Sequence, residues 1–208
     1  MTYDVPSRSL KNLLEEHTTE YQSQLSGSPG ESHLLERGVT PEAIQHFRLG
    51  YVGEPAQGDD YYRGRISIPY TTVTGVVSIR FRSLEVDPEK KYLTVQGESA
   101  RPYNVDCLKK AKLLILTEGE IDTIICWQMG LASLGIPGAD AWNPLWARFL
   151  RFRKVVMFAD GDDAGKRCAA TVKKDVPSLI VFSMPWKKDV NDMYLDKGET
   201  YFRSLLNG

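Results

Sequence analysis

Apolar residues recur along this chain with two different spacings, and the spacing changes near residue 112. Residues 9–25 place Leu10, Leu14 and Tyr21 on one face, which predicts an amphipathic helix. The segment SGSPGES breaks that pattern, HLLERG forms a short helix, and Thr40 caps a further helix over PEAIQHF. RISIPY, VVSIRFRSL and KYLTV then alternate as short strands do. We therefore expect an N-terminal helical extension over residues 1–32 and a small α+β subdomain over residues 33–111.

The second spacing is one of apolar runs separated by helical segments. LLILT, LASLG, VVMFA and LIVFSM are nearly continuous apolar strands, and a helical pattern follows each of them. Strands that are apolar on both faces are typical of a parallel sheet covered by helices on both sides. Residues 112–208 are therefore predicted to form a doubly wound, Rossmann-like domain, and the fold class is α/β.

Composition excludes several classes of protein. Apolar residues make up 42% of the chain and charged residues 25%, as in ordinary soluble proteins. The longest apolar runs are far shorter than the roughly 20 residues that a membrane helix needs, and the N-terminus has no secretion signal. The three cysteines form no CxxC pair, so neither a disulfide framework nor a zinc ribbon is expected. The predicted location is cytoplasmic, with no membrane partner.

The net charge of −1 conceals an uneven distribution along the chain. Residues 1–60 carry 4 basic and 10 acidic groups, residues 61–112 carry 10 and 5, and residues 113–208 carry 12 of each. A basic middle segment predicts a local site for a polyanion rather than a molecule coated in positive charge.

Carboxylates follow three of the four predicted parallel strands. Because ligands of open α/β sheets sit at the carboxyl ends of the strands, these acids are expected to share one edge, where they would repel without a cation. Oxygen ligands without nearby His or Cys favour Mg²⁺ or Mn²⁺ over zinc. Singly, an acid such as Asp163, Asp192 or Glu120 is as well explained as a helix cap, but capping does not explain the whole set. The set is Glu118, Asp122, Asp160, Asp162, Asp163, Asp189 and Asp192.

Cations of the middle segment are also spaced regularly. Arg80 and Arg82 are two apart on one strand and so project from the same face, with Arg65 on a neighbouring strand. Such a face suits phosphate groups, although any single Arg or Lys is often only a solvated side chain. The nearby Tyr92 could stack on a base or only pack, and packing is the favoured interpretation. The basic and aromatic run RFLRFRK at 148–154 is interpreted as a helix end that enters a strand.

Three motifs carry a resemblance to a known fold. TEGEID, FADGDDAGK and KDVND resemble, in order and spacing, the EGxxD, DxDxxG and KDxN(D/E) signatures of the TOPRIM fold. Primases, type IA and type II topoisomerases and some nucleases share that fold. The resemblance covers about residues 112–195 and implies a metal-dependent enzyme acting on nucleic acid.

The upstream segments narrow the resemblance to one group. HLLERGVTPEAIQHFRLGY, RGRISIPY, GVVSIRFRSL and KKYLTVQ resemble the catalytic core of DnaG-type and phage DNA primases. The implied function is synthesis of short RNA primers on single-stranded DNA from NTPs, by a DNA-directed RNA polymerase that uses two Mg²⁺ or Mn²⁺ ions and no zinc. QGESARPYNV departs from the family pattern, and the family's zinc-binding module and a Walker A motif have no counterpart here. A replicative helicase and a polymerase are the expected partners.

The resemblance also assigns roles to residues. The catalytic set comprises Glu118, Asp122, Asp160 and Asp162, with Glu118 either a metal ligand or the group that helps to deprotonate the attacking hydroxyl. The metal ligands are Glu118, Asp160, Asp162, Asp189 and Asp192. The nucleotide- or DNA-binding set comprises Arg37, Arg65, Arg80, Arg82, Lys90, Lys91 and Lys166.

Two other functions compete with primer synthesis. A TOPRIM nuclease would hydrolyse nucleic acid with the same metals, and a non-catalytic TOPRIM module would only bind it. A topoisomerase is disfavoured, because the chain is short and offers no evident gate domains. The sequence leaves open the template sequence and the choice between ribo- and deoxyribonucleotides.

Overall fold

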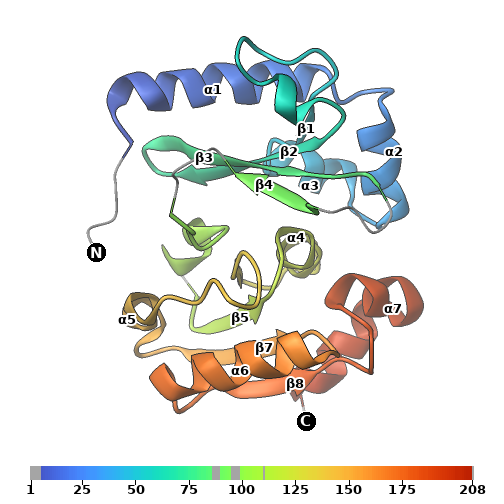
Figure 1. Ribbon diagram of the computed structural model, residues 1–208. Coiled ribbons are helices and arrows are strands. Elements are labelled where there is room, and N and C mark those ends of the chain that lie inside the picture. Colours follow the sequence, from blue (N-terminus) through green and yellow to red (C-terminus); the bar gives the residue numbers. More distant parts are fainter. Residues whose placement is uncertain (1–5, 86–89, 95–98, 110, 208) are drawn as a thin grey trace. The chain divides into compact units, whose positions relative to one another are not determined.

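The computed structural model of the chain describes residues 6–85, 90–94, 99–109 and 111–207 (Figure 1). The chain divides into two compact units, Met1–Ser99 and Ala100–Gly208. Within the described residues, no helix combines the length and the apolar character needed to cross a membrane.

The first unit is an antiparallel sheet with a long helix packed across it (Figure 1). Its strand order is β1-β2-β3-β4, and Tyr21 of the helix is fully buried, with its ring edge against Phe81 of β3. The strands are β1 (Gly50–Tyr51), β2 (Ile66–Thr72), β3 (Gly75–Arg82) and β4 (Tyr92–Thr94). The helices are α1 (Arg8–Ser23), α2 (Pro29–Glu36), α3 (Pro41–His46) and the 3-10 turn η1 (Asp60–Tyr62).

The predicted elements of this unit are present, with two differences. Helix α2 begins inside SGSPGES, because the Ser28 side chain accepts a hydrogen bond from the Glu31 N–H and Pro29 occupies the first helical turn. Strand β1 was not predicted, since two residues are too few to show an alternating pattern.

The second unit is a four-stranded parallel sheet with the order β6-β5-β7-β8. Its strands are β5 (Leu113–Thr117), β6 (Ser133–Gly135), β7 (Lys154–Ala159) and β8 (Ile180–Ser183). Its helices are α4 (Glu120–Gln128), α5 (Ala147–Leu150), α6 (Asp163–Asp175) and α7 (Val190–Asn207), with the 3-10 turns η2 (Val105–Lys109) and η3 (Pro144–Trp146). The predicted α/β class is confirmed.

Helices cover both faces of the parallel sheet. Met157 of β7 packs in one buried cluster with Cys168 and Val172 of α6. The adjacent residue, Phe158, points to the opposite face, where its ring lies 5.2 Å from that of Phe202 in α7. Alternate residues of one strand therefore serve two cores, which explains why these strands are apolar throughout.

The first unit ends at Ser99 along the chain, whereas the sequence pattern placed the boundary after residue 111. Residues 100–109 belong with the parallel sheet, because Tyr103 forms a backbone bridge with Gly135 and Leu108 packs against the core. Helix α1 lies within the first compact unit, although the pattern treated residues 1–32 as a separate extension.

Candidate active site at the carboxyl edge of the parallel sheet

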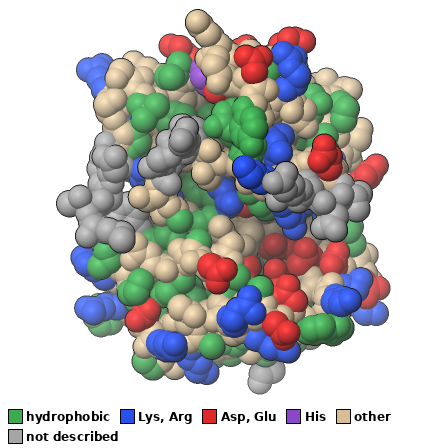
Figure 2. All heavy atoms as spheres, viewed as in Figure 1, with side chains coloured by type: hydrophobic (Ala, Val, Ile, Leu, Met, Phe, Trp, Pro, Cys, Tyr) green, Lys and Arg blue, Asp and Glu red, His purple; other side chains and the backbone are tan. Residues whose placement is uncertain are grey.

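The order of the strands reverses at one point of the parallel sheet. The chain leaves β5 to form β6 on one side, and then crosses to β7 on the other side. The carboxyl ends of β5 and β7 therefore flank a topological switch point, where ligands of α/β folds bind. Glu118 directly follows β5, and Asp160 directly follows β7. Figure 2 shows Asp and Glu side chains gathered on the surface between α4 and α7.

A hydrogen bond joins the two strand ends. The backbone N–H of Asp160 donates to Oε1 of Glu118 over 2.9 Å. Helix α6 starts against this pair, because Gly165 has no side chain: a Cβ there would lie 2.3 Å from the Asp160 carbonyl oxygen and 2.9 Å from Glu118 Oε1. Gly165, the second glycine of DGDDAG, is thus required by close packing at the site.

Glu118 is the acid whose ionisation is most affected by its surroundings. Its side chain is only 7% exposed, and this burial raises the pKa from 4.5 to about 7. The Asp162 and Asp122 carboxylates raise the pKa further, while the hydrogen bond from Asp160 lowers it. A carboxyl group that titrates near neutral pH is typical of a catalytic or metal-binding position.

The raised pKa of Glu118 predicts how stability depends on pH without metal. Between pH 4.5 and 7 the unfolded chain releases the Glu118 proton while the folded chain keeps it, so the free energy of unfolding falls as pH rises. The expected loss is about 3 kcal/mol. Denaturation of wild type and of Glu118→Gln in a chelator should show this fall in wild type alone. Parallel pH profiles for the two proteins would contradict the prediction.

Asp122 and Asp162 lie close enough to influence Glu118, and each also has a structural role. Asp122 Oδ1 accepts the backbone N–H of Asn191 over 3.0 Å, which ties α4 to the start of α7. Asp162 caps α6, because its Oδ1 accepts the Gly165 N–H over 2.7 Å. Asn191 is almost completely buried and was missing from the predicted site, although it stands inside the KDVND motif.

Asp189 and Asp192 form a reciprocal cap at the start of α7. Asp189 Oδ1 accepts the Asp192 N–H over 2.7 Å, and Asp192 Oδ2 accepts the Asp189 N–H over 3.3 Å. This loop is tied to the end of β7, since the Gly161 N–H donates to the Lys188 carbonyl over 2.8 Å. The reciprocal bonds with Asp189 give Asp192 a capping role, and its predicted role as a metal ligand stays a prediction.

The candidate metal ligands are of the type that hard divalent ions prefer. They are carboxylate oxygens at one sheet edge, and the raised pKa of Glu118 reflects, besides burial, the neighbouring carboxylates that a cation would neutralise. Among the described residues, however, no three His, Cys, Asp or Glu side chains surround a common point. The assignment of individual ligands therefore stays a prediction.

The predicted cations of the first unit include a pair around one tyrosine. The guanidinium groups of Arg80 and Arg82 lie 4.6 and 5.4 Å from the ring centre of Tyr92, so the two arginines do project from the same face of β3. Arg82 also donates to the Tyr92 hydroxyl and is only 6% exposed, whereas Arg80 is partly exposed. Tyr92 is thus in contact with both arginines, and its role stays a prediction.

The other predicted cations have more varied surroundings. Burial of His33 lowers its pKa, and the charges of Arg82 and Arg37 lower it further, so these three side chains are neighbours. Arg65 donates to the Lys90 carbonyl over 3.0 Å, while Lys90 and Lys91 are exposed. In the second unit, Lys166 pairs with Asp163 and lies 5.2 Å from the Trp186 ring centre.

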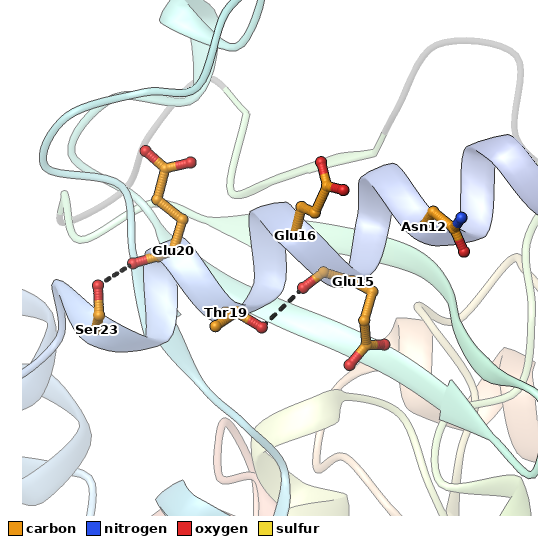
Figure 3. Close-up of a pocket in the computed structure, with 6 residues that line it drawn as sticks. All are labelled: Asn12, Glu15, Glu16, Thr19, Glu20 and Ser23. Carbon is orange, nitrogen blue, oxygen red and sulfur yellow. Dashed lines mark hydrogen bonds between the residues drawn. The ribbon is translucent and has the colours of Figure 1, made fainter.

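A separate hollow on the first unit runs along α1 (Figure 3). Its walls carry three carboxylates, and the Thr19 and Ser23 hydroxyls donate to helix carbonyls instead of pointing to a ligand. An acidic wall repels a polyanion, so this hollow is not assigned to the nucleic-acid interface. The lining residues are Asn12, Glu15, Glu16, Thr19, Glu20 and Ser23.

Comparison with known proteins assigns the chain to a family. The Toprim-like family matches residues 115–194. The Gene 57 protein of Mycobacterium phage D29 is 37% identical over 145 residues, which cover 66% of this chain and 95% of the phage protein. The DNA primase of Enterococcus faecalis is 27% identical over 232 residues, which cover 87% of this chain and 37% of the primase. The chain belongs to the TOPRIM-fold, DnaG-type primase catalytic core family.

Solved structures of this family share the fold. A DnaG primase catalytic domain bound to ssDNA has a TM-score of 0.80 at 19% identity, covering 96% of this chain and 78% of that one. The RNA polymerase domain of Mycobacterium tuberculosis primase DnaG has a TM-score of 0.79 at 19% identity, covering 97% and 84%. The chain spans little more than a third of the length of the curated bacterial primases it matches, as the 37% coverage above illustrates.

Proposed function

We propose that this family member is a DNA primase catalytic core that synthesises short RNA primers on single-stranded DNA by two-metal nucleotidyl transfer. The observation that carries the proposal is the hydrogen bond from the Asp160 backbone N–H to the Glu118 carboxylate, at the switch point between β5 and β7. Cytoplasmic replication in a bacterium or a phage-infected cell is the proposed setting, with a replicative helicase and a polymerase as partners.

The carboxylates divide between holding metal and moving a proton. Asp160, Asp162 and Asp189 would hold Mg²⁺ or Mn²⁺, with Asp192 supporting Asp189 through their reciprocal cap. When bound, such ions stabilise the negative charge on the attacking and leaving oxygens of a phosphoryl transfer. With a pKa of about 7, Glu118 can serve as a ligand or accept the proton of the primer 3′-hydroxyl at neutral pH. Asp122 would position the site through its bond to Asn191.

The cations of the first unit would hold the template and the triphosphate. Support comes from the basic face of β3, where Arg80 and Arg82 flank Tyr92, and from the neighbouring Arg37. Lys90 and Lys91 are exposed at the start of the next strand, and Arg65 is hydrogen-bonded to the Lys90 carbonyl. A solved DnaG catalytic domain of the same fold is described as bound to ssDNA. Lys166 is assigned to phosphate, in competition with its pairing to Asp163.

The direct test is incubation of the chain with single-stranded DNA, Mg²⁺ or Mn²⁺ and labelled NTPs. Short oligonucleotides that depend on the template are the expected product, and replacing NTPs by dNTPs measures sugar preference. Degradation of the template without synthesis would identify a TOPRIM nuclease instead. Binding of DNA with neither reaction would identify a non-catalytic module.

Removing the partly exposed arginine of β3 should weaken template binding. Arg80→Ala is expected to lower affinity for single-stranded DNA by about 5- to 10-fold, and to reduce the slope of log affinity against log salt by about 0.7 for each phosphate that the variant no longer neutralises. Fluorescence anisotropy over a range of NaCl concentrations measures both quantities. Arg63→Ala is the matched control, because Arg63 is exposed and pairs with Glu54 and Asp60 outside the predicted set. Equal decreases in affinity for the two variants would contradict the assignment of Arg80.

A further inference from the structure

The turn between α5 and β7 displays a phenylalanine in a backbone conformation that disfavours it. The Leu150 carbonyl accepts the Arg153 N–H over 3.3 Å, and Arg151 has φ −56° and ψ 141°, as in a type II turn. Phe152 follows with φ 64°, at the turn position where glycine is the favoured residue. The backbone of the turn therefore gives no reason for an aromatic side chain there.

Packing gives no reason for it either. Phe152 is 104% exposed relative to a reference residue, so its ring buries no apolar surface within the second unit. Phe149, on the preceding helical turn, is also exposed. A ring that costs strain and contributes nothing to the core is explained most simply by a contact outside the chain.

The turn is held firmly in place by one side chain. The Arg153 guanidinium donates to the carbonyls of Phe149 over 2.6 Å, Leu108 over 2.7 Å and Ala111 over 3.1 Å. These bonds tie the turn to the segment that precedes β5. A backbone that is already ordered loses little conformational freedom when a ligand binds, which favours a role of the turn in recognition.

The surroundings of the Phe152 turn, defined as residues 148–154, are basic. Arg148, Arg151 and Lys154 are exposed. Lys112, whose carbonyl accepts a hydrogen bond from the Lys154 N–H, is also exposed. In the part of the chain that the structure describes, none of these four side chains takes part in an ion pair. Asp106, on the adjoining segment, already pairs with Lys109.

The Phe152 turn lies away from the carboxylates. It precedes β7, whereas Asp160 follows that strand, and six residues of strand separate the two by about 20 Å. The turn follows α5 in Figure 1, at the amino ends of the parallel strands. A polyanion held here would not meet the repulsion of the acidic edge.

We propose that the Phe152 turn is a second binding site for single-stranded nucleic acid. A base would stack on the Phe152 ring, and phosphates would contact Arg151, Lys154 and Lys112. Single strands supply a flat ring face and regularly spaced negative charges together, which is the combination that the turn presents. An acidic protein surface would satisfy the charges but would leave the projecting ring without a stacking partner.

The test measures binding of a labelled oligothymidylate to the full chain in EDTA, without nucleotides, so it does not depend on synthesis. Phe152→Gly suits the turn and is expected to fold at least as stably as wild type, yet to bind about 5- to 20-fold more weakly. Phe152→Trp should retain affinity. Arg151→Glu should weaken binding and reduce its salt dependence, whereas Arg8→Glu, at an exposed position on α1, serves as the charge control.

A cross-linking measurement separates this turn from the basic face of β3. An oligothymidylate carrying 5-iodouracil, irradiated with wild type, should form an adduct within residues 148–154 that does not form with Phe152→Gly. Unchanged affinity of Phe152→Gly and Arg151→Glu, with adducts confined to other segments, would overturn the proposal and would leave an acidic protein surface as the ligand to examine.

Discussion

Replacing Asp160 by Asn is expected to reduce template-dependent synthesis by about 10³-fold or more, while binding of single-stranded DNA in EDTA stays within about twofold of wild type. The amide keeps the size of the carboxylate, so the backbone N–H of residue 160 can still donate to Glu118 Oε1. What is removed is a negative charge at the switch point, and stabilisation of a transition state by metal is worth several kcal/mol, with each 1.36 kcal/mol equal to a factor of ten. Product formation on a gel, at several Mg²⁺ concentrations, measures the effect.

Asp163→Asn is the matched control for Asp160→Asn. Asp163 belongs to the same DGDD run but is exposed and pairs with Lys166, so its amide should leave synthesis close to wild type. Full synthesis by Asp160→Asn would place the metal site elsewhere and would favour the non-catalytic module. An equal reduction in both variants would mean that total charge, and not position, matters.

Adding one methyl group at Gly161 is expected to disturb both stability and synthesis. A Cβ at this position would lie 1.8 Å from the carbonyl oxygen of Pro185, so the backbone of one of the two loops has to move. Overpacking against backbone costs about 3 kcal/mol, and displacement of catalytic groups by about 1 Å costs about 10²-fold in rate. Gly161→Ala should therefore unfold at lower urea concentration and synthesise primers about 10²-fold more slowly.

Tryptophan fluorescence is the suitable probe for Gly161→Ala. All four tryptophans, Trp127, Trp142, Trp146 and Trp186, belong to the second unit, so the signal reports on the unit that carries the substitution. Gly53→Ala is the control, because the atoms nearest to its added Cβ belong to side chains, the Gln24 oxygen at 3.2 Å and the Tyr51 ring at 3.6 Å. Since Gly53 lies in the first unit, which has no tryptophan, unfolding of the control is followed by far-UV circular dichroism. A wild-type unfolding midpoint for Gly161→Ala would contradict the close approach of the two loops.

The parallel sheet and the acidic edge were predictable because each follows from local pattern. Apolar runs such as VVMFA require burial on both faces, and helices between them make the strands parallel. Parallel strands end at one edge, so Glu118 after β5 and Asp160 after β7 had to share it. The same reasoning fails for β1, which is two residues long and has no period to detect.

Burial and capping at the site were not predictable in the same way. Arg80 and Arg82 were predicted to lie on the same face of one strand, yet only Arg82 is buried. Its guanidinium donates a hydrogen bond to the Tyr92 hydroxyl. Asp162 and Asp192 have hydrogen bonds that depend on where helices α6 and α7 begin. The spacing of residues along a strand predicts the face from which a side chain projects, but the residues that bury it come from distant segments.

The sequence by itself determined the order of the elements, the α/β class and the delivery of carboxylates to one sheet edge, because strand period, helix period and chain direction are local properties. Only the tertiary structure decided the pKa of Glu118, since that value depends on desolvation and on the charge of Asp162, which another segment brings close, in addition to that of the nearby Asp122. The tertiary structure likewise decided that Phe152 lies outside the core, because the exposure of a side chain depends on whether distant segments pack against it.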